Sequence, residues 1–228
     1  MPRQEYVQQL GEVQDDLLLI GSMVDKAIHR SVTALKSRDG KTAQQVIDDD
    51  DAIDIRQVQL EERTLDLMST QQPMATDLRQ LVTAIHVASE LERMGDYAEG
   101  IAKITLLMGQ QPPIKPLIDI PRMAEISRDM VRGSLGALVK RDTEAASRIW
   151  QRDDEVDELH QHVYRELLTI MTEDPARIER ATYLIWVSHN LERIADRATN
   201  IAERVIFVCT GHVPTRDEWL DKQLADSG

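Results

Sequence analysis

The sequence predicts an all-α protein built as two tandem three-helix antiparallel bundles, a six-helix fold with an internal repeat. Three observations indicate this. Prolines stand only at positions 2, 73, 112, 113, 116, 121, 175 and 214, and the blocks between them are long enough for long helices. The second half of the chain repeats the motifs of the first. Aromatic residues make up only 4% of the chain, which argues against a sheet core rich in Phe, Tyr and Trp.

Turn signals inside the long blocks divide the chain further. Residues 37–41 and 140–143 are polar, so they separate two helices in each half. We expect helices over residues 4–37, 41–71, 74–109, 118–140, 143–173 and 176–210. Residues 1–111 form the first repeat, 112–121 the linker, 122–211 the second repeat, whose first helix starts near 118, and 212–228 a polar tail.

The register of the repeat supports these helices. At an offset of 103, Val46, Ile53, Leu60 and Leu67 correspond to Ile149, Val156, Val163 and Ile170. At an offset of 100, eight apolar or small residues from Ala84 to Met108 correspond to eight from Leu184 to Val208. Their spacing alternates between three and four residues, which is typical of a coiled-coil seam.

Composition limits the function. A net charge of −13 argues against binding to nucleic acid or to an anionic membrane surface, and it suits a cation site or a basic partner. No run approaches the roughly 20 apolar residues of a membrane span. The N-terminus has no hydrophobic signal region, so we expect a cytoplasmic protein. The single cysteine, Cys209, excludes an intramolecular disulfide, and its apolar surroundings predict that it is buried.

Each half carries two pairs of carboxylates at i, i+4 spacing, beside the apolar seam. Such a pair lies on one face of a helix. Adjacent antiparallel helices would gather four carboxylates, and such a cluster needs a cation. The first set is Asp50, Asp54, Glu92 and Asp96, and the second is Asp153, Asp157, Glu192 and Asp196. Oxygen ligands suit Mg²⁺ or Mn²⁺, and carboxylate-bridged iron or zinc also fits.

Two alternatives stay open. The carboxylates could be solvated or paired with arginines in a metal-free helical scaffold. The chain could instead be a di-iron carboxylate bundle, an oxidase or an iron store, but neither Glu92 nor Glu192 begins a Glu-x-x-His motif. We find no motif for catalysis and predict no catalytic residue. His189 shares a helical stripe with Glu192, so it could join the second site or be structural.

Three motifs resemble those of the PhoU family, over nearly the whole chain. They are Asp-x-x-Ile/Val-Asp, Pro-x-Ala-x-Asp-Leu-Arg at 73–79, and Leu-Glu-Arg-x-Gly/Ala-Asp at 91–96 and 191–196. The resemblance implies a non-enzymatic regulator that restrains the phosphate-starvation response. Its expected partners are the ATPase subunit of the phosphate ABC transporter and a phosphate-sensing histidine kinase. It also implies a homodimer that reaches the membrane only through these partners.

The resemblance further implies that each carboxylate set holds a metal centre of Fe, Zn, Mn or Mg. The family often has an asparagine four residues after the last aspartate. Asn200 matches this position in the second half, but Gly100 stands there in the first, where Glu99 could substitute. This difference predicts that the second site binds metal more tightly.

Overall fold

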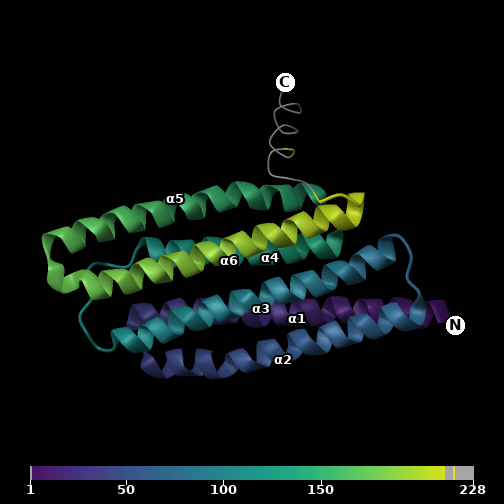
Figure 1. The fold of residues 1–228 in the computed structure, drawn as a ribbon, viewed down its shortest axis with the longest axis horizontal. Coiled ribbons are helices and arrows are strands. Elements are labelled where there is room, and N and C mark those ends of the chain that lie inside the picture. The colour runs from purple at the N-terminus through teal and green to yellow at the C-terminus, as the bar shows by residue number, and fades with distance from the viewer. Residues whose placement is uncertain (1, 214–217, 219–228) are drawn as a thin grey trace.

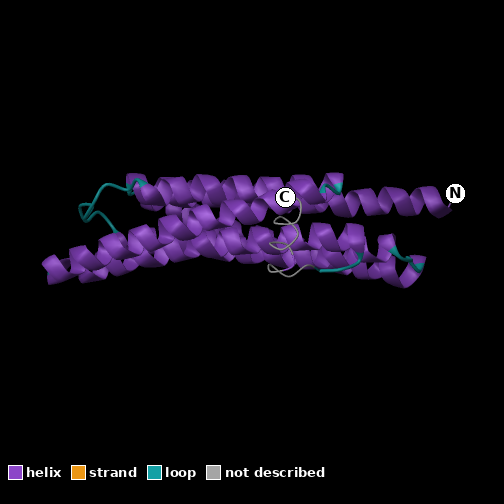
Figure 2. Cartoon of the chain, turned by 90° about the horizontal axis from the view of Figure 1, so that it is seen from above, coloured by secondary structure: helices purple, strands orange, loops and turns teal. Residues whose placement is uncertain are grey.

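The computed structural model describes residues 2–213 and 218 and confirms the all-helical prediction (Figures 1 and 2). No residue in that part of the chain lies in a strand. The helices are α1 (Pro2–Ser37), α2 (Gly40–Gln71), α3 (Thr76–Met108), α4 (Asp119–Lys140), α5 (Thr143–Glu173) and α6 (Ile178–Thr210), and a short 3₁₀ helix (Pro175–Arg177) precedes α6.

The loops within the two repeats use the same turn chemistry. Arg38 and Arg141 each follow a helix with a left-handed backbone, at φ 57° and 54°. The next residue caps the following helix: the Asp39 carboxylate accepts from the backbone N–H groups of Lys41 and Thr42, and Asp142 does the same for Ala145. These caps satisfy N–H groups that a helix start leaves without partners. They explain why the helices begin so close to the predicted residues.

Three helix starts differ from the prediction by two residues: α1 begins at Pro2 rather than at 4, α6 at Ile178 rather than at 176, and α3 also begins later. Helix α3 begins at Thr76 rather than at 74, because Ala75 has a backbone φ of 48° that a helix cannot contain. The prolines at 73 and 175 both lie just before the third helix of a repeat, as their helix-breaking chemistry requires.

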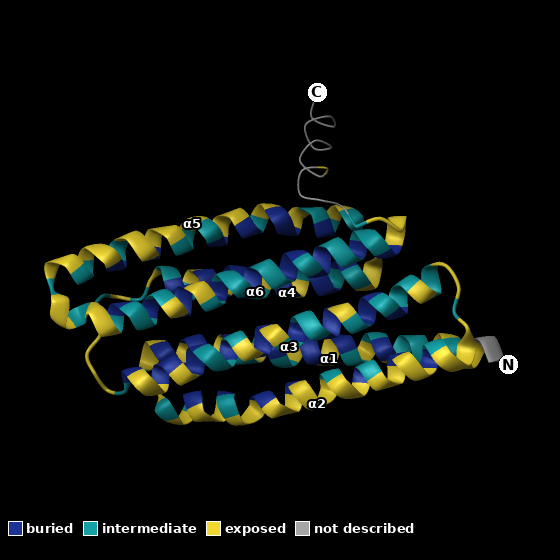
Figure 3. Cartoon of the chain, in the orientation of Figure 1, coloured by how far each residue is buried: buried dark blue, intermediate teal, exposed yellow. Residues whose placement is uncertain are grey.

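The predicted seams form the core. All eight seam positions of α3 and all eight of α6 are buried, with exposures between 0 and 4%. The seams of α2 and α5 are buried as well, except Ile170, which is partly buried at the edge of the core. The outer faces of α2 and α5 are exposed (Figure 3).

The two repeats share one hydrophobic core. Helices α3 and α6 pack against each other, α1 contacts α4, and one continuous cluster of buried side chains includes Leu91 and Leu191. An ion pair joins α4 to α1, with Arg128 Nη2 2.8 Å from Asp25 Oδ2. The sequence predicted the two bundles but did not indicate that they fuse along their third helices.

Two further features concern the surface. Within the described residues, no helix has the length and apolar character needed to cross a membrane. Cys209 is exposed, so the expectation that it is buried is wrong. The α6 seam reaches the core through Val208, and the next residue is rotated by about 100° around the helix axis.

Candidate metal centre

Three of the four carboxylates predicted for the first repeat meet where α2 packs against α3. Asp50 and Asp54 come from successive turns of α2, and Asp96 comes from α3. One carboxylate oxygen of each lies within 4.8 Å of the others. Asp50 is the inner member at 8% exposure, whereas Asp54 and Asp96 face solvent. The cluster is therefore closed on its protein side and open on its outer side.

Gly95 permits this geometry. A Cβ atom at this position would lie 2.9 Å from Asp50 Oδ1 and 3.2 Å from the Ile53 Cδ1 methyl. A side chain on α3 would therefore push α2 or the Asp50 carboxylate outward. The glycine of the Leu-Glu-Arg-x-Gly-Asp motif thus lets the buried carboxylate sit against the backbone of α3.

The charges of the cluster repel one another. Burial, followed by the nearby charges of Glu99, Asp54 and Asp96, raises the pKa of Asp50 from 3.8 to about 7, while Lys103 acts in the opposite direction. Burial, followed by the neighbouring carboxylates, also raises the pKa values of Asp54 and Asp96. A divalent cation would remove this repulsion and favour the charged carboxylates.

Two other predicted residues lie at the edge of this cluster. Burial, then Asp96 and Asp54, raises the pKa of Glu92, so its carboxylate is within electrostatic reach of the cluster. Glu99 is close enough to act on Asp50, but its carboxylate accepts a salt bridge from Lys103 at 2.5 Å. The three aspartates thus form the compact ligand set, with Glu92 and Glu99 beside it.

The second predicted set is held differently. Burial and then Asp196 raise the pKa of Glu192, and Asp157 contributes to the same shift. Nitrogen-bearing side chains stand among these carboxylates: His189 Nδ1 lies 3.2 Å from Glu192 Oε2, and Arg193 Nη1 lies 3.5 Å from Asp196 Oδ2. Among the described residues, this set does not reach the 4.8 Å spacing of the first cluster.

Asp153 is buried at 7% exposure, like Asp50 in the first repeat. The equivalence of the two repeats therefore extends to the inner carboxylate.

The difference between Gly100 and Asn200 has a packing cause. A Cβ atom at Gly100 would lie 2.9 Å from the Asn190 side-chain nitrogen, so the Asn190 side chain of α6 would have to move to admit a larger residue. Asn200 Nδ2 donates to Glu90 Oε2 at 3.3 Å, across the same interface. Asn200 thus serves the contact between the repeats. This weakens the reason to expect tighter metal binding at the second set. The close spacing of Asp50, Asp54 and Asp96 favours tighter binding at the first.

One cluster was not foreseen from the sequence. Asp119, His162 and Glu166 have ligand atoms within 4.8 Å of one another, and His162 Nδ1 lies 3.0 Å from Asp119 Oδ2. Glu166 already forms a salt bridge with Lys115, and the Lys115 side chain is only 10% exposed. The i, i+4 spacing of His162 and Glu166 was the only local signal. We interpret this cluster as an ion-paired contact of the linker with α5.

Comparison with known proteins decides the family. The PhoU domain model matches the chain twice, over residues 17–105 and 120–205. The chain belongs to the PhoU family. The two matched segments correspond to the two three-helix repeats of the fold, and the resemblance seen in the sequence motifs is confirmed.

Named relatives agree with this assignment. The phosphate-specific transport system accessory protein PhoU homolog of Aquifex aeolicus is 38% identical over 205 residues, 90% of this chain and 93% of the relative. The homolog of Clostridium acetobutylicum is 36% identical over 92% of this chain and 97% of its own length. The crystal structure of PhoU from Pseudomonas aeruginosa superimposes with a TM-score of 0.87 at 32% identity, over 91% of this chain and all of that one.

The metal-free form of this PhoU-family chain should lose stability as the pH rises through 7. Because the pKa of Asp50 is raised to about 7 from 3.8, the folded chain keeps a proton that the unfolded chain releases. Its stabilising contribution is complete below pH 3.8 and is lost through pH 7, by about 2 kcal/mol between pH 5.5 and 8. Chemical denaturation of chelator-treated protein at both pH values measures it.

The variant Asp50→Asn isolates this contribution, because histidines titrate in the same range. The pH dependence of the variant should be flatter than that of the wild type by the same amount. Equal slopes for the two proteins would contradict the assignment of the shift to Asp50.

Proposed function

We propose that the protein is a non-enzymatic, cytoplasmic regulator of phosphate uptake that restrains the phosphate-starvation response. In this proposal it acts between the ATPase subunit of the phosphate ABC transporter and a phosphate-sensing histidine kinase. The observation that carries the proposal is the double PhoU-domain match along a chain whose relatives are named as accessory proteins of the phosphate-specific transport system.

The proposed metal centre belongs to this regulator. Asp50, Asp54 and Asp96 would hold a divalent ion, with Glu92 or Glu99 completing its coordination. Mg²⁺ and Mn²⁺ suit such oxygen ligands, and Fe or Zn could be bridged by the carboxylates. The ion would neutralise the repelling charges and join α2 to α3. The second set, Asp153, Asp157, Glu192 and Asp196, is proposed as a weaker centre, because an ion there must displace the His189 and Arg193 side chains from Glu192 and Asp196.

The surface suits a protein that works by docking. A net charge of −13 favours partners with basic patches, and the rate of such an association falls as salt rises. Large apolar side chains stand exposed on the outer face of α2, among them Ile55, Val58 and Leu65 at 50–57% exposure. Such residues could contact the transporter, the kinase or a second copy in a homodimer.

Deleting the gene should raise the expression of phosphate-starvation genes in phosphate-rich medium. The reason is that the kinase would lose the restraint that this protein is proposed to supply. A transcriptional reporter and phosphate uptake, measured in the organism that encodes the chain, test the proposal. Wild-type protein supplied from a plasmid should restore low expression, and at low salt it should co-purify with the transporter ATPase or the kinase.

Two results would contradict the proposal. One is a deletion strain with normal reporter expression and normal uptake, combined with no co-purifying transporter or kinase component. The other is oxygen-dependent turnover of bound iron by the purified protein, which would favour the di-iron bundle instead.

A further inference from the structure

Two arginines from different repeats contact the segment that joins α3 to α4. Arg38, in the turn between α1 and α2, donates from Nη1 to the carbonyl of Gln111. Arg180, in the first turn of α6, donates from Nη1 to the carbonyl of Pro112 at 3.0 Å. Because these carbonyls belong to successive residues, both guanidinium groups lie beside the same short stretch of backbone. Figure 1 shows this segment and the start of α6 at the same end of the molecule.

No carboxylate offsets the two positive charges. Within the described residues neither arginine forms an ion pair, whereas Arg177, three residues before Arg180, has its Nε atom 2.8 Å from Asp174 Oδ2. Burial, and then the charge of Arg180, lowers the pKa of Arg38, so the two guanidinium groups repel each other. An arginine nevertheless stays charged in a protein. The contact therefore gathers two cations on neutral acceptors, in a chain whose net charge is −13.

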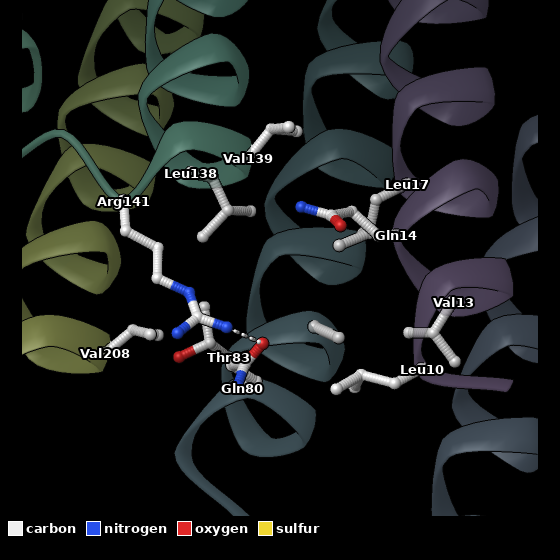
Figure 4. A pocket seen from close by; sticks show the side chains of 11 residues that line it. Leu10, Val13, Gln14, Leu17, Gln80, Thr83, Leu138, Val139, Arg141 and Val208 are labelled. Carbon is white, nitrogen blue, oxygen red and sulfur yellow. Dashed lines mark hydrogen bonds between the residues drawn. The ribbon is translucent and has the colours of Figure 1, made fainter. Parts of the chain in front are cut away.

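The equivalent contact in the other half of the repeat is neutralised differently. Arg141 corresponds to Arg38 at the offset of 103, and the two share a left-handed backbone. Arg141 Nη2 donates to Gln80 Oε1 at 2.7 Å (Figure 4). Gln80 corresponds to Arg180 at the offset of 100. A second cation thus stands where the equivalent position carries an acceptor for the arginine, and an anion between the two cations would restore the balance.

The chemistry of the pair selects the anion. Each guanidinium has five N–H donors in a planar fork, and the hydrogen bonds described for Arg38 and Arg180 use only Nη1. Both side chains are partly exposed, so a ligand can approach from solvent. Such forks match the oxygens of carboxylates and phosphates. A carboxylate brings one negative charge, whereas a phosphate group brings nearly two and three acceptor oxygens, which suits two cations better.

We propose that Arg38 and Arg180 form a binding site for a phosphate group, carried by free inorganic phosphate or by a phosphomonoester. The group accepts hydrogen bonds from both guanidinium groups and offsets their repulsion. It thereby joins the turn between α1 and α2 to the start of α6, and it stabilises the contact between the repeats. The proposal needs neither the metal centre nor the regulatory role.

Calorimetric titration of the chelator-treated full chain with inorganic phosphate, phenyl phosphate and acetate tests this proposal. The chelator ensures that no bound metal ion holds the anion, and the ionic strength is kept constant because salt screens exposed charges. At about pH 8 a phosphate group should bind in the millimolar range, at least about tenfold more tightly than acetate. Tighter binding of inorganic phosphate would support the free ion as the ligand, and tighter binding of phenyl phosphate a phosphomonoester. Dissociation constants above about 10 mM for both, or equal affinity for acetate, would overturn the proposal.

The variant Arg180→Gln reproduces the neutral contact between Arg141 and Gln80. It should bind phosphate at least about tenfold more weakly than the wild type. In phosphate-free buffer it should melt no lower than the wild type, because the repulsion with Arg38 is gone. Phosphate should raise the melting temperature of the wild type and leave that of the variant unchanged. Wild-type phosphate affinity in Arg180→Gln would refute the site.

Two further variants separate the geometry of the site from its charge. Arg38→Lys keeps the positive charge but loses the planar fork, so it should also weaken phosphate binding. Arg148→Gln removes an equal charge from an exposed residue that pairs with Glu144, and it should bind phosphate like the wild type. An equal loss of affinity in Arg148→Gln would show that phosphate responds to the general charge of the chain, and would overturn the proposal.

Discussion

Replacing Leu91 or Leu191 by alanine should lower the free energy of unfolding of the whole chain by about 2–5 kcal/mol, because each side chain is fully buried in the core that the two repeats share. For a chain of this size the melting temperature should fall by roughly 4–20 °C. Circular dichroism during thermal unfolding measures the shift. The exposed Leu107, on the same helix as Leu91, supplies the control: Leu107→Ala should change stability by no more than about 0.5 kcal/mol.

The number of transitions matters as much as the shift. Since α3 and α6 pack together along one continuous core, either variant should unfold in a single transition, with equal calorimetric and van't Hoff enthalpies. Two separate transitions, with Leu91→Ala moving one and Leu191→Ala moving the other, would show that the repeats unfold independently.

Removing the Asp96 carboxylate should weaken divalent metal binding at the first cluster by at least about 100-fold. Mutations of residues that only support a metal ligand already cost 10- to 100-fold, and Asp96 is one of the three clustered groups. The equivalent variant, Asp196→Ala, should leave this binding intact. Calorimetric titration of metal-free protein with Mn²⁺, Mg²⁺, Zn²⁺ and Fe²⁺ measures both. Asp48→Ala, an exposed acidic residue near Asp50, is the control for a general loss of charge.

Metal binding should also stabilise the fold. A site saturated at about 100 times its dissociation constant adds roughly 2.7 kcal/mol to the unfolding free energy, and a chelator should remove that amount. In Asp96→Ala the chelator should have little effect, because the strong site is gone. An equal response of the variant and the wild type would place the stabilising ion elsewhere.

The sequence was sufficient to predict the helices. Proline positions and the aspartates at 39 and 142 mark helix ends locally. Proline cannot continue a helix, and each aspartate side chain caps the N–H groups at the start of the next helix. The seams were equally predictable, because apolar residues spaced alternately by three and four positions all lie on one face of a helix, and that face is buried. Ile170 is partly buried because it lies where the core ends.

The candidate site was predictable only in part. The i, i+4 spacing placed the carboxylates beside the seam, but how tightly they converge depends on how closely two helices approach. Gly95 controls that distance at the first set, and its counterpart in the second repeat is Ala195. The sequence shows that alanine replaces glycine at this position of the second repeat. Its effect on the carboxylates depends on the distance between α3 and the Asp50 carboxylate, which only the structure gives.

Contacts between the repeats were beyond the sequence. Asn200 matched a family ligand position, yet its amide donates to Glu90 of the other repeat. Gly100 looked like a lost ligand, whereas the structure shows that the Asn190 side chain of the other repeat occupies the space beside it. Long-range packing of this kind leaves no periodic signal in a single chain.

The most direct test of the proposed centre is the metal content of three purified proteins after dialysis against the same low concentration of divalent metal. We expect wild type and Asp196→Ala to retain metal, and Asp96→Ala to lose the tightly held ion. If Asp96→Ala keeps its metal while Asp196→Ala loses it, the tight centre lies in the second repeat. If the wild type retains none, the carboxylates of the first repeat are not a metal site.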